Sequence, residues 1–335
     1  MAIDEPPRQP SPPVGVRIFM GPFGLRAGWR LTLFAILFAA LALGGSELLK
    51  RAYSLLPGGT AGEFREGSFV LYVLLAMWIM SRVDGRPLVS FGLGGVDRLR
   101  NFLLGLAAGI AALSVLIAAL VLAGVYHFGS PVLHGGDVLL WGTVMAAGFL
   151  MVGLFEELLM RGYPLFALSQ GIGFWPAAIL LSILFGAGHL GNRGEETIGV
   201  CNAMLAGLVF AWSLRWSGSL WWAIGCHMSW DWGESFFYGV ADSGSVSAHR
   251  FLAGRPSGAG WLSGGSVGPE GSLLAIPALL LLALIVWATT RKQEAPGLGR
   301  RRKPPISSPS SSTSTPSTPP VPPPAEREWD SGHPA

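Results

Sequence analysis

Long apolar runs alternate with short polar connections along most of the chain. A helix needs about 20 apolar residues to cross the hydrocarbon core of a bilayer, so each long run predicts a membrane segment. The two shortest runs need flanking residues to span the bilayer. The pattern predicts an all-α fold, a polytopic transmembrane helix bundle of about eight segments. These segments are 31–45, 68–81, 102–126, 138–168, 174–190, 199–216, 220–240 and 273–290.

Composition and charge fit a protein that lies in a lipid bilayer. Hydrophobic residues make up 50% of the 335 positions and charged residues 13%, against about 25% charged residues in soluble proteins. The net charge of +3 is small, and the basic residues form short clusters between apolar runs. We read them as topology signals, so no nucleic-acid partner is expected. Their excess in alternate connections predicts a multi-pass protein of the cell (plasma) membrane with both termini in the cytosol.

Composition also divides the chain into four parts. Residues 1–30 hold prolines and arginines without a cleavable apolar core, which predicts a retained, flexible cytosolic leader. N-terminal transmembrane helices are expected over 31–136 and the chemically active helices over 137–290. The Pro/Ser-rich end, 291–335, predicts a disordered cytosolic tail.

Ionisable side chains inside apolar runs are the candidates for chemistry. Each costs at least about 2.5 kcal/mol in a membrane helix, so each is a functional hypothesis. Arg161 follows Glu157 by four residues, about 40° around a helix, but follows Glu156 by five, about 140° around it. Glu157 is therefore expected to pair with Arg161. Glu156 faces elsewhere, which suits a general base, although a charge pair at a helix end would also explain these three residues.

Two later runs add further polar groups. His189 follows Phe185 near the end of the fifth run, and His227 and Asp231 stand four residues apart in the seventh. That spacing puts the last two on one helix face. A single histidine is more often a packing residue with a carbonyl partner. Carboxylates and histidines on three helices are harder to assign to packing, because unpaired polar groups are costly in a water-poor interior.

These groups suit hydrolysis, and more than one mechanism is open. A carboxylate and an imidazole that converge on one water can deprotonate it for attack on a peptide carbonyl. Glu156, His189 and His227 are also residue types that hold zinc, so a Zn cofactor stays possible, although no HExxH helix is present. A proton-coupled transporter would use similar groups but predicts internal repeats, and none is found.

The three motifs in order resemble a known family. They are EExxxR at Glu156, Glu157 and Arg161, then FxxxH ending at His189, then HxxxD from His227 to Asp231. The set, within 138–240, is similar to the CPBP family of intramembrane endopeptidases, which includes CAAX prenyl proteases and bacteriocin-processing proteins. The stretches WDWGESFFY (230–238) and GSVGPEGSL (265–273) resemble one bacterial branch of it.

The resemblance implies an all-helical protease with a cavity open toward the cytosolic leaflet. In that reading Glu156 and His189 activate the water, and His227 with Asp231 lines the oxyanion side. Glu157 and Arg161 support the site. Asp231 departs from the asparagine of the prenyl proteases, so it is either a neutral carboxyl or an acceptor that orients His227.

The substrate expected from this resemblance is a peptide or a membrane-protein segment. Prenyl processing is not expected, because the composition and the branch resemblance suggest a bacterial protein, and a bacterial cell need not contain prenylated proteins. The alternative is a family member that has lost catalysis and acts as a binding or immunity protein.

Overall fold

The computed structural model describes residues 14–21, 24–53, 61–293, 295 and 297–298. The predicted leader falls partly outside these residues, and the predicted tail falls almost wholly outside them. Within the leader, the described residues form a short helix, a two-stranded hairpin and the first turn of the next helix.

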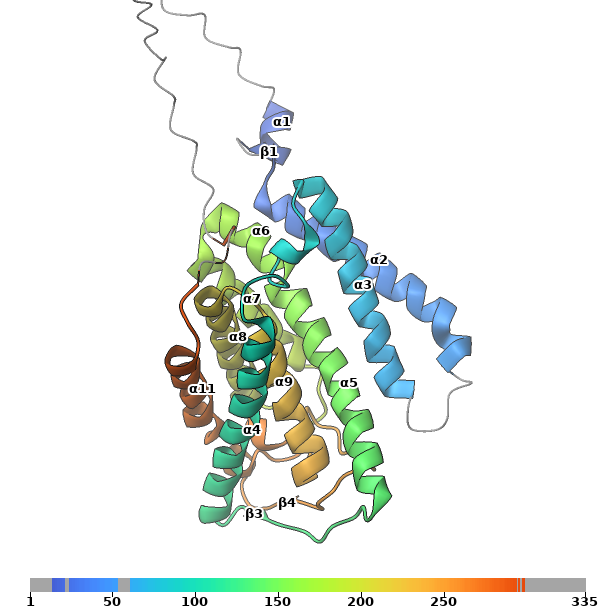
Figure 1. Cartoon of the computed structure of the whole chain (residues 1–335), viewed down its shortest axis with the longest axis vertical. Coiled ribbons are helices and arrows are strands. Elements are labelled where there is room, and N and C mark those ends of the chain that lie inside the picture. The colour runs from blue at the N-terminus through green and yellow to red at the C-terminus, as the bar shows by residue number, and fades with distance from the viewer. Residues whose placement is uncertain (1–13, 22–23, 54–60, 294, 296, 299–335) are drawn as a thin grey trace, which may run out of the picture. The chain divides into compact units, whose positions relative to one another are not determined.

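Helices build the described part of the chain, and each predicted segment overlaps at least one helix (Figure 1). The strands are short pairs, β1 (Met20–Gly21) with β2 (Gly24–Leu25) and β3 (Tyr126–His127) with β4 (Arg255–Pro256). The 3₁₀-helices are η1 (Leu88–Ser90) and η3 (Pro269–Gly271), and a π-helix, η2 (Gly233–Tyr238), continues α9. The all-α prediction is confirmed. The α-helices are α1 (Val14–Phe19), α2 (Ala27–Tyr53), α3 (Ala61–Asp84), α4 (Arg98–Leu122), α5 (Gly136–Arg161), α6 (Tyr163–Ile172), α7 (Phe174–His189), α8 (Thr197–Ser217), α9 (Trp221–Trp232), α10 (Gly260–Ser263) and α11 (Ala275–Thr289).

Several helical stretches are long and apolar enough to cross a membrane. Two further helices, α7 and α11, are apolar but shorter. Apolar side chains such as Leu43 and Leu48 on α2 point outward, as side chains in contact with lipid do. Length and composition therefore make this a multi-pass membrane protein. In the described part of the chain the long stretches are Ala27–Lys50, Gly67–Asp84, Arg98–Leu122, Gly136–Ile172 and Thr197–Ser217.

The fourth predicted segment is two helices, because the chain breaks at Gly162. This residue has ψ −127°, outside the helical range, and Pro164 occupies the first turn of α6. A Cβ at Gly162 would collide with the carbonyl oxygen of Leu158. The break makes Arg161 the last residue of α5 and turns α6 away from the α5 axis (Figure 1).

Helix α9 lies between α4 and α5, and small residues let it approach α4 closely (Figure 1). A Cβ at Gly105 would overlap the carbonyl oxygen of Trp222, and one at Gly109 would overlap that of Cys226. Glycine at such contacts lets two helix backbones meet. The position of α9, which carries two of the predicted site residues, therefore depends on its fit against α4.

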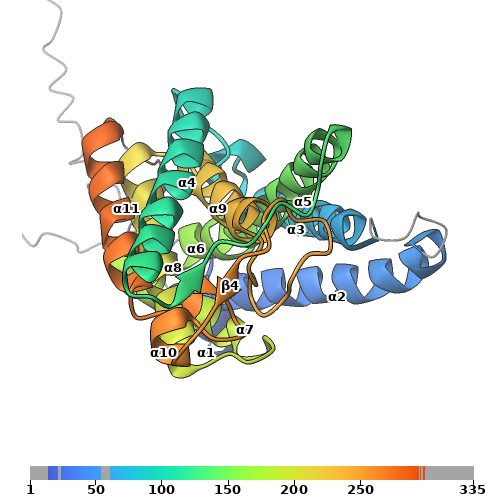
Figure 2. The ribbon, with the colours of Figure 1, turned by 90° about the horizontal axis from the view of Figure 1, so that it is seen from below.

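Helices α2 and α3 lie side by side and join the bundle through α5 and α6 (Figure 2). The link is Arg30, which forms a buried ion pair with Asp84 at the end of α3. Arg30 also donates to the Tyr163 hydroxyl at 3.1 Å and to Gln170 Oε1 at 2.9 Å. One arginine of α2 thus connects three helices.

Candidate active site

A buried network joins α5 to α9. Arg161 Nη1 donates to Glu157 Oε1 at 2.8 Å, which is the expected pair, and both side chains are buried. His227 Nδ1 lies 3.1 Å from the same carboxylate oxygen. The Arg161 guanidinium also stacks over the Phe185 ring, 4.2 Å from its centroid. Glu157 therefore fixes the His227 ring and balances the charge of Arg161.

Glu156 faces a different side of α5 from its neighbour. Its Oε2 lies 3.5 Å from His227 Nε2, and its side chain is 28% exposed. His227 Nε2 is also 3.5 Å from Asp231 Oδ2. Both distances exceed those of ordinary hydrogen bonds, which run to about 3.2 Å. One edge of the imidazole is thus held by Glu157, and the other meets two carboxylates without a tight bond.

His189 ends α7 with one ring nitrogen already engaged. Its Nδ1 lies 2.8 Å from the carbonyl oxygen of Phe185, and its ring packs edge-on against the Phe185 ring. A carbonyl oxygen only accepts, so Nδ1 carries the hydrogen of this bond. In a neutral imidazole Nε2 is then the acceptor. The local turn of α7 therefore leaves His189 with a nitrogen that can take a proton from a water.

A cavity of about 450 Å³ brings these side chains together. Glu156, His189, His227 and Asp231 all line it, whereas Glu157 and Arg161 lie behind its wall. Its volume falls within the range of small-molecule sites, about 300–1,000 Å³. The four residues predicted to be catalytic therefore share one cavity and come from α5, α7 and α9. The apolar part of the lining is Phe149, Val152, Phe185, Ala203, Ala206, Phe210, Trp230, Ala275, Leu279 and Leu282.

Comparison with protein families matches this part of the chain. Residues 137–233 match the family described as type II CAAX prenyl endopeptidase Rce1-like. This segment is similar to the Rce1-like family. It runs from the start of α5 to the start of η2 and contains all three motifs, so the family resemblance is confirmed. Searches of curated proteins and of solved structures found no match.

The cavity also has polar walls outside the Rce1-like motifs, and these were not among the predicted site residues. The prediction singled out charges inside apolar runs, whereas the additional polar residues lie mostly in connections.

Ser243 donates from its backbone nitrogen and its hydroxyl to Glu270 Oε1, at 2.7 and 3.1 Å. Burial raises the pKa of Glu195 and of Glu270 above the ordinary value, and His189 acts against both shifts. Only Glu270 had a sequence signal, the stretch 265–273. The missed polar residues are Asn192, Glu195, Asn202, Asp242, Ser243, Ser245 and Glu270.

The positions of the possible metal-ligand atoms test the zinc alternative. In the described part of the chain, one set of three His, Cys, Asp or Glu side chains has ligand atoms within 4.8 Å of one another: Glu234, Asp242 and Glu270. Glu156, His189 and His227 of the Rce1-like segment form no such set, so as placed they do not fit a three-ligand zinc site.

Proposed function

We propose that this protein is an intramembrane endopeptidase that hydrolyses a peptide bond with a water activated by Glu156 and His189. One observation carries the proposal: both side chains line the same cavity, within a segment that is similar to a peptidase family. The cavity wall combines these polar groups with apolar side chains, which suits a peptide segment that enters from a lipid environment.

The reaction follows from the positions of the groups. The Glu156 carboxylate takes a proton from a water that also donates to His189 Nε2, and the resulting hydroxide forms a bond to the carbonyl carbon. His227 takes part as an imidazolium, because its Nδ1–H already donates to Glu157 and its Nε2 must carry a second hydrogen. The carbonyl electron pair moves to its oxygen, which accepts a hydrogen bond from His227 Nε2–H. As the C–N bond breaks, the proton held by Glu156 passes to the leaving nitrogen. The products are a carboxylic acid and an amine, and the acid then releases its remaining proton.

The buried network behind the cavity supports this role of His227. Glu157 accepts from His227 Nδ1 and from Arg161, so the ring cannot turn without breaking a bond to a buried carboxylate. Breaking a buried charge pair is costly. The fixed ring directs Nε2 toward Glu156 and the cavity, where an oxyanion would form.

A second candidate, a family member that binds peptide without cutting it, is favoured by one residue. Asp231 stands where the prenyl proteases have asparagine, and an ionised carboxylate beside His227 Nε2 repels an oxyanion. This candidate predicts that a peptide binds to the cavity and that no product forms.

Cleavage of a membrane-peptide library by the purified protein tests both candidates, with products read by mass spectrometry. The variants are Glu156→Gln and His189→Ala, each with and without a chelator. The matched control is Glu196→Gln, the same change at an exposed position. We expect cleavage by wild type and control with or without chelator. We expect a loss of at least about 100-fold in each site variant, because general acid–base catalysis contributes about 10²–10⁴.

Other outcomes would change the assignment. Activity that survives Glu156→Gln refutes the mechanism. Activity that a chelator removes and zinc restores assigns the reaction to a metal. Peptide that binds to a folded wild type and is never cut supports the non-catalytic binder.

A further inference from the structure

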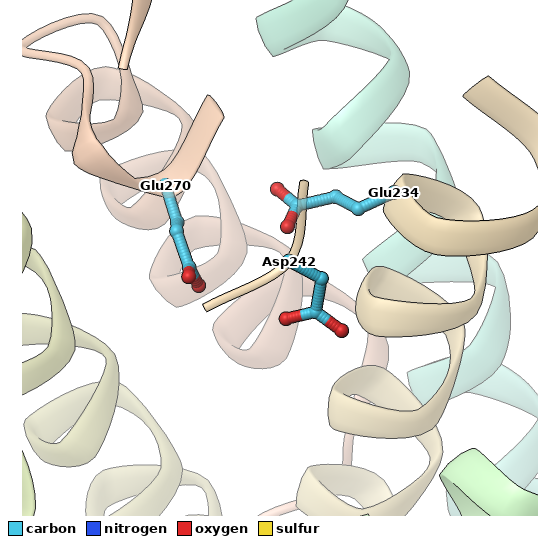
Figure 3. Close-up of side chains that lie close together, drawn as sticks. All are labelled: Glu234, Asp242 and Glu270. Atoms are coloured by element: carbon cyan, nitrogen blue, oxygen red, sulfur yellow. The ribbon is translucent and has the colours of Figure 1, made fainter. Parts of the chain in front are cut away.

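Three carboxylates from separate segments meet beside the cavity, just beyond the Rce1-like segment (Figure 3). Glu234 comes from η2, Asp242 from the connection that follows it, and Glu270 from η3. Each offers a ligand oxygen, and these oxygens lie within 4.8 Å of one another. Asp242 and Glu270 also line the cavity, whereas Glu234 lies behind its lining. We call these three residues the carboxylate cluster.

Glu234 is the member of the carboxylate cluster that most needs a partner. Its side chain is 0% exposed. Neither of its carboxylate oxygens has a hydrogen bond of ordinary geometry, and the Trp230 side chain interacts with it only weakly. Figure 3 shows the Glu234 carboxylate directed toward the space between Asp242 and Glu270. A buried carboxylate without compensation is costly, so either a cation or a proton must neutralise it.

The other two carboxylates are held in place by hydrogen bonds. The hydroxyl of Ser235 donates to Asp242 Oδ2 at 3.2 Å. Glu270 Oε1 accepts two bonds from Ser243. Each carboxylate keeps a second oxygen for another ligand. Burial, with the negative charges of Asp231 and Glu270, raises the pKa of Asp242 well above its ordinary value.

No basic side chain of the described residues forms an ion pair with the carboxylate cluster. Within that part of the chain, the ion pairs of Arg and Lys go to other carboxylates, Asp84, Glu47 and Glu157. His189 and His227 act on the cluster only at longer range. Three carboxylates therefore face one another without a positive charge of the described chain between them.

We propose that Glu234, Asp242 and Glu270 bind a divalent cation that prefers oxygen ligands, such as Ca²⁺. Ca²⁺ takes six to eight oxygens and accepts carboxylates in one-oxygen or two-oxygen geometry, so three carboxylates supply most of its shell. The ion joins η2, the connection after it and η3. The connection and η3 line the cavity through Asp242 and Glu270, and η2 lies behind them, so the ion's role is to hold that wall in place. The site is independent of whether the protein cleaves peptides.

Calcium binding by the full-length purified protein tests this site without any cleavage assay. The protein is stripped with a chelator and titrated with Ca²⁺, with Mn²⁺ in parallel as a paramagnetic probe. We expect saturable binding and a rise in the unfolding midpoint, because a ligand that binds only the native state stabilises it. Both effects should be lost in Asp242→Asn and Glu270→Gln and kept in the control Glu196→Gln.

Two outcomes would overturn the proposal. One is a folded wild type that binds neither ion and unfolds at the same temperature with and without Ca²⁺. The other is binding that is unchanged in Asp242→Asn, Glu270→Gln and Glu234→Gln. The titration of the wild type distinguishes binding from its absence even if a variant does not fold. Failure of the peptidase proposal would leave these readouts unaffected.

Discussion

Two adjacent glutamates of α5 have very different surroundings. Consecutive helical residues point about 100° apart. Glu157 is buried against Arg161 and His227, whereas Glu156 is partly exposed in the cavity. The same side chain therefore serves as an internal charge partner at one position and as a candidate base at the next.

Substituting each glutamate by glutamine separates these roles. Glu157→Gln leaves the buried Arg161 without its carboxylate, and breaking a buried pair costs about 3–5 kcal/mol. Glu156→Gln leaves that pair intact, so we expect loss of cleavage with little change in stability. Unfolding midpoints and kcat/KM of the two variants are the measurements. Equal destabilisation by both changes would contradict this division.

Asp231→Asn tests what Asp231 does beside His227. Its Oδ2 lies 3.5 Å from Nε2, too far for a strong bond. Asparagine keeps the size of the side chain and can donate to an oxyanion, so we expect cleavage to be kept within about tenfold or increased. Rates across pH are the measurement, with His227→Ala as the inactive reference. A loss as large as that of the reference would show that the carboxylate itself is required.

At the residue scale, the sequence predicts the members of the site better than their contacts. Charge inside apolar runs singled out Glu156 and Glu157, and helical spacing predicted the Glu157–Arg161 pair. The bond from Glu157 to His227 joins residues 70 positions apart, so it depends on how α5 packs on α9. The catalytic roles stay predictions.

At the element scale, the contact between α4 and α9 positions two site residues. Gly109→Ala places a methyl group against the carbonyl oxygen of Cys226, which should push α9 away. Gly44→Ala is the matched control, because a Cβ there meets nothing within 4 Å on α2. We expect Gly109→Ala to lower the unfolding midpoint and kcat/KM. The control should be neutral or slightly stabilising, by up to about 1 kcal/mol. Equal behaviour of the two variants would argue against a tight α4–α9 contact.

The apolar pattern predicted the elements well and their interruptions poorly. The segments 174–190 and 199–216 agree closely with α7 and α8. The run 138–168 continues through Gly162 without a loss of apolar character, so hydropathy alone reads one helix there. The break depends on the backbone geometry at Gly162 and the proline after it. Helix α2 extends beyond 31–45 at both ends, because helical bonding continues into polar positions.

At the scale of the whole molecule, three connections gather at one end of the bundle. Strand β3, after α4, pairs with β4, after η2, and the segment after α7 lies against both 239–245 and 266–271. Figure 1 shows β3 and β4 at the end of the bundle opposite α6. The count of basic residues assigned all three connections to the outer side. A common end for all three connections agrees with their assignment to one side of the membrane.

Cysteine labelling decides the orientation. Val246→Cys and Val96→Cys are matched, because both valines are exposed in connections. With both termini in the cytosol, an impermeant thiol reagent should reach Cys at 246 in intact cells and Cys at 96 only after permeabilisation. A Cys201→Ala background removes the exposed native cysteine. The reverse labelling pattern would refute cytosolic termini. The three connections, and the cavity that they border, would then face the cytosol.

The negative charge of the cavity lining affects which peptide bond of a substrate can lie beside Glu156 and His189. Among the described residues that line it, acidic side chains are present and neither Lys nor Arg is. A bond only a few residues from the free carboxyl end of a substrate would bring that carboxylate among like charges, which repel it in a low-dielectric site. For the proposed peptidase we therefore expect cleavage of bonds in the interior of a polypeptide and little trimming at a carboxyl end.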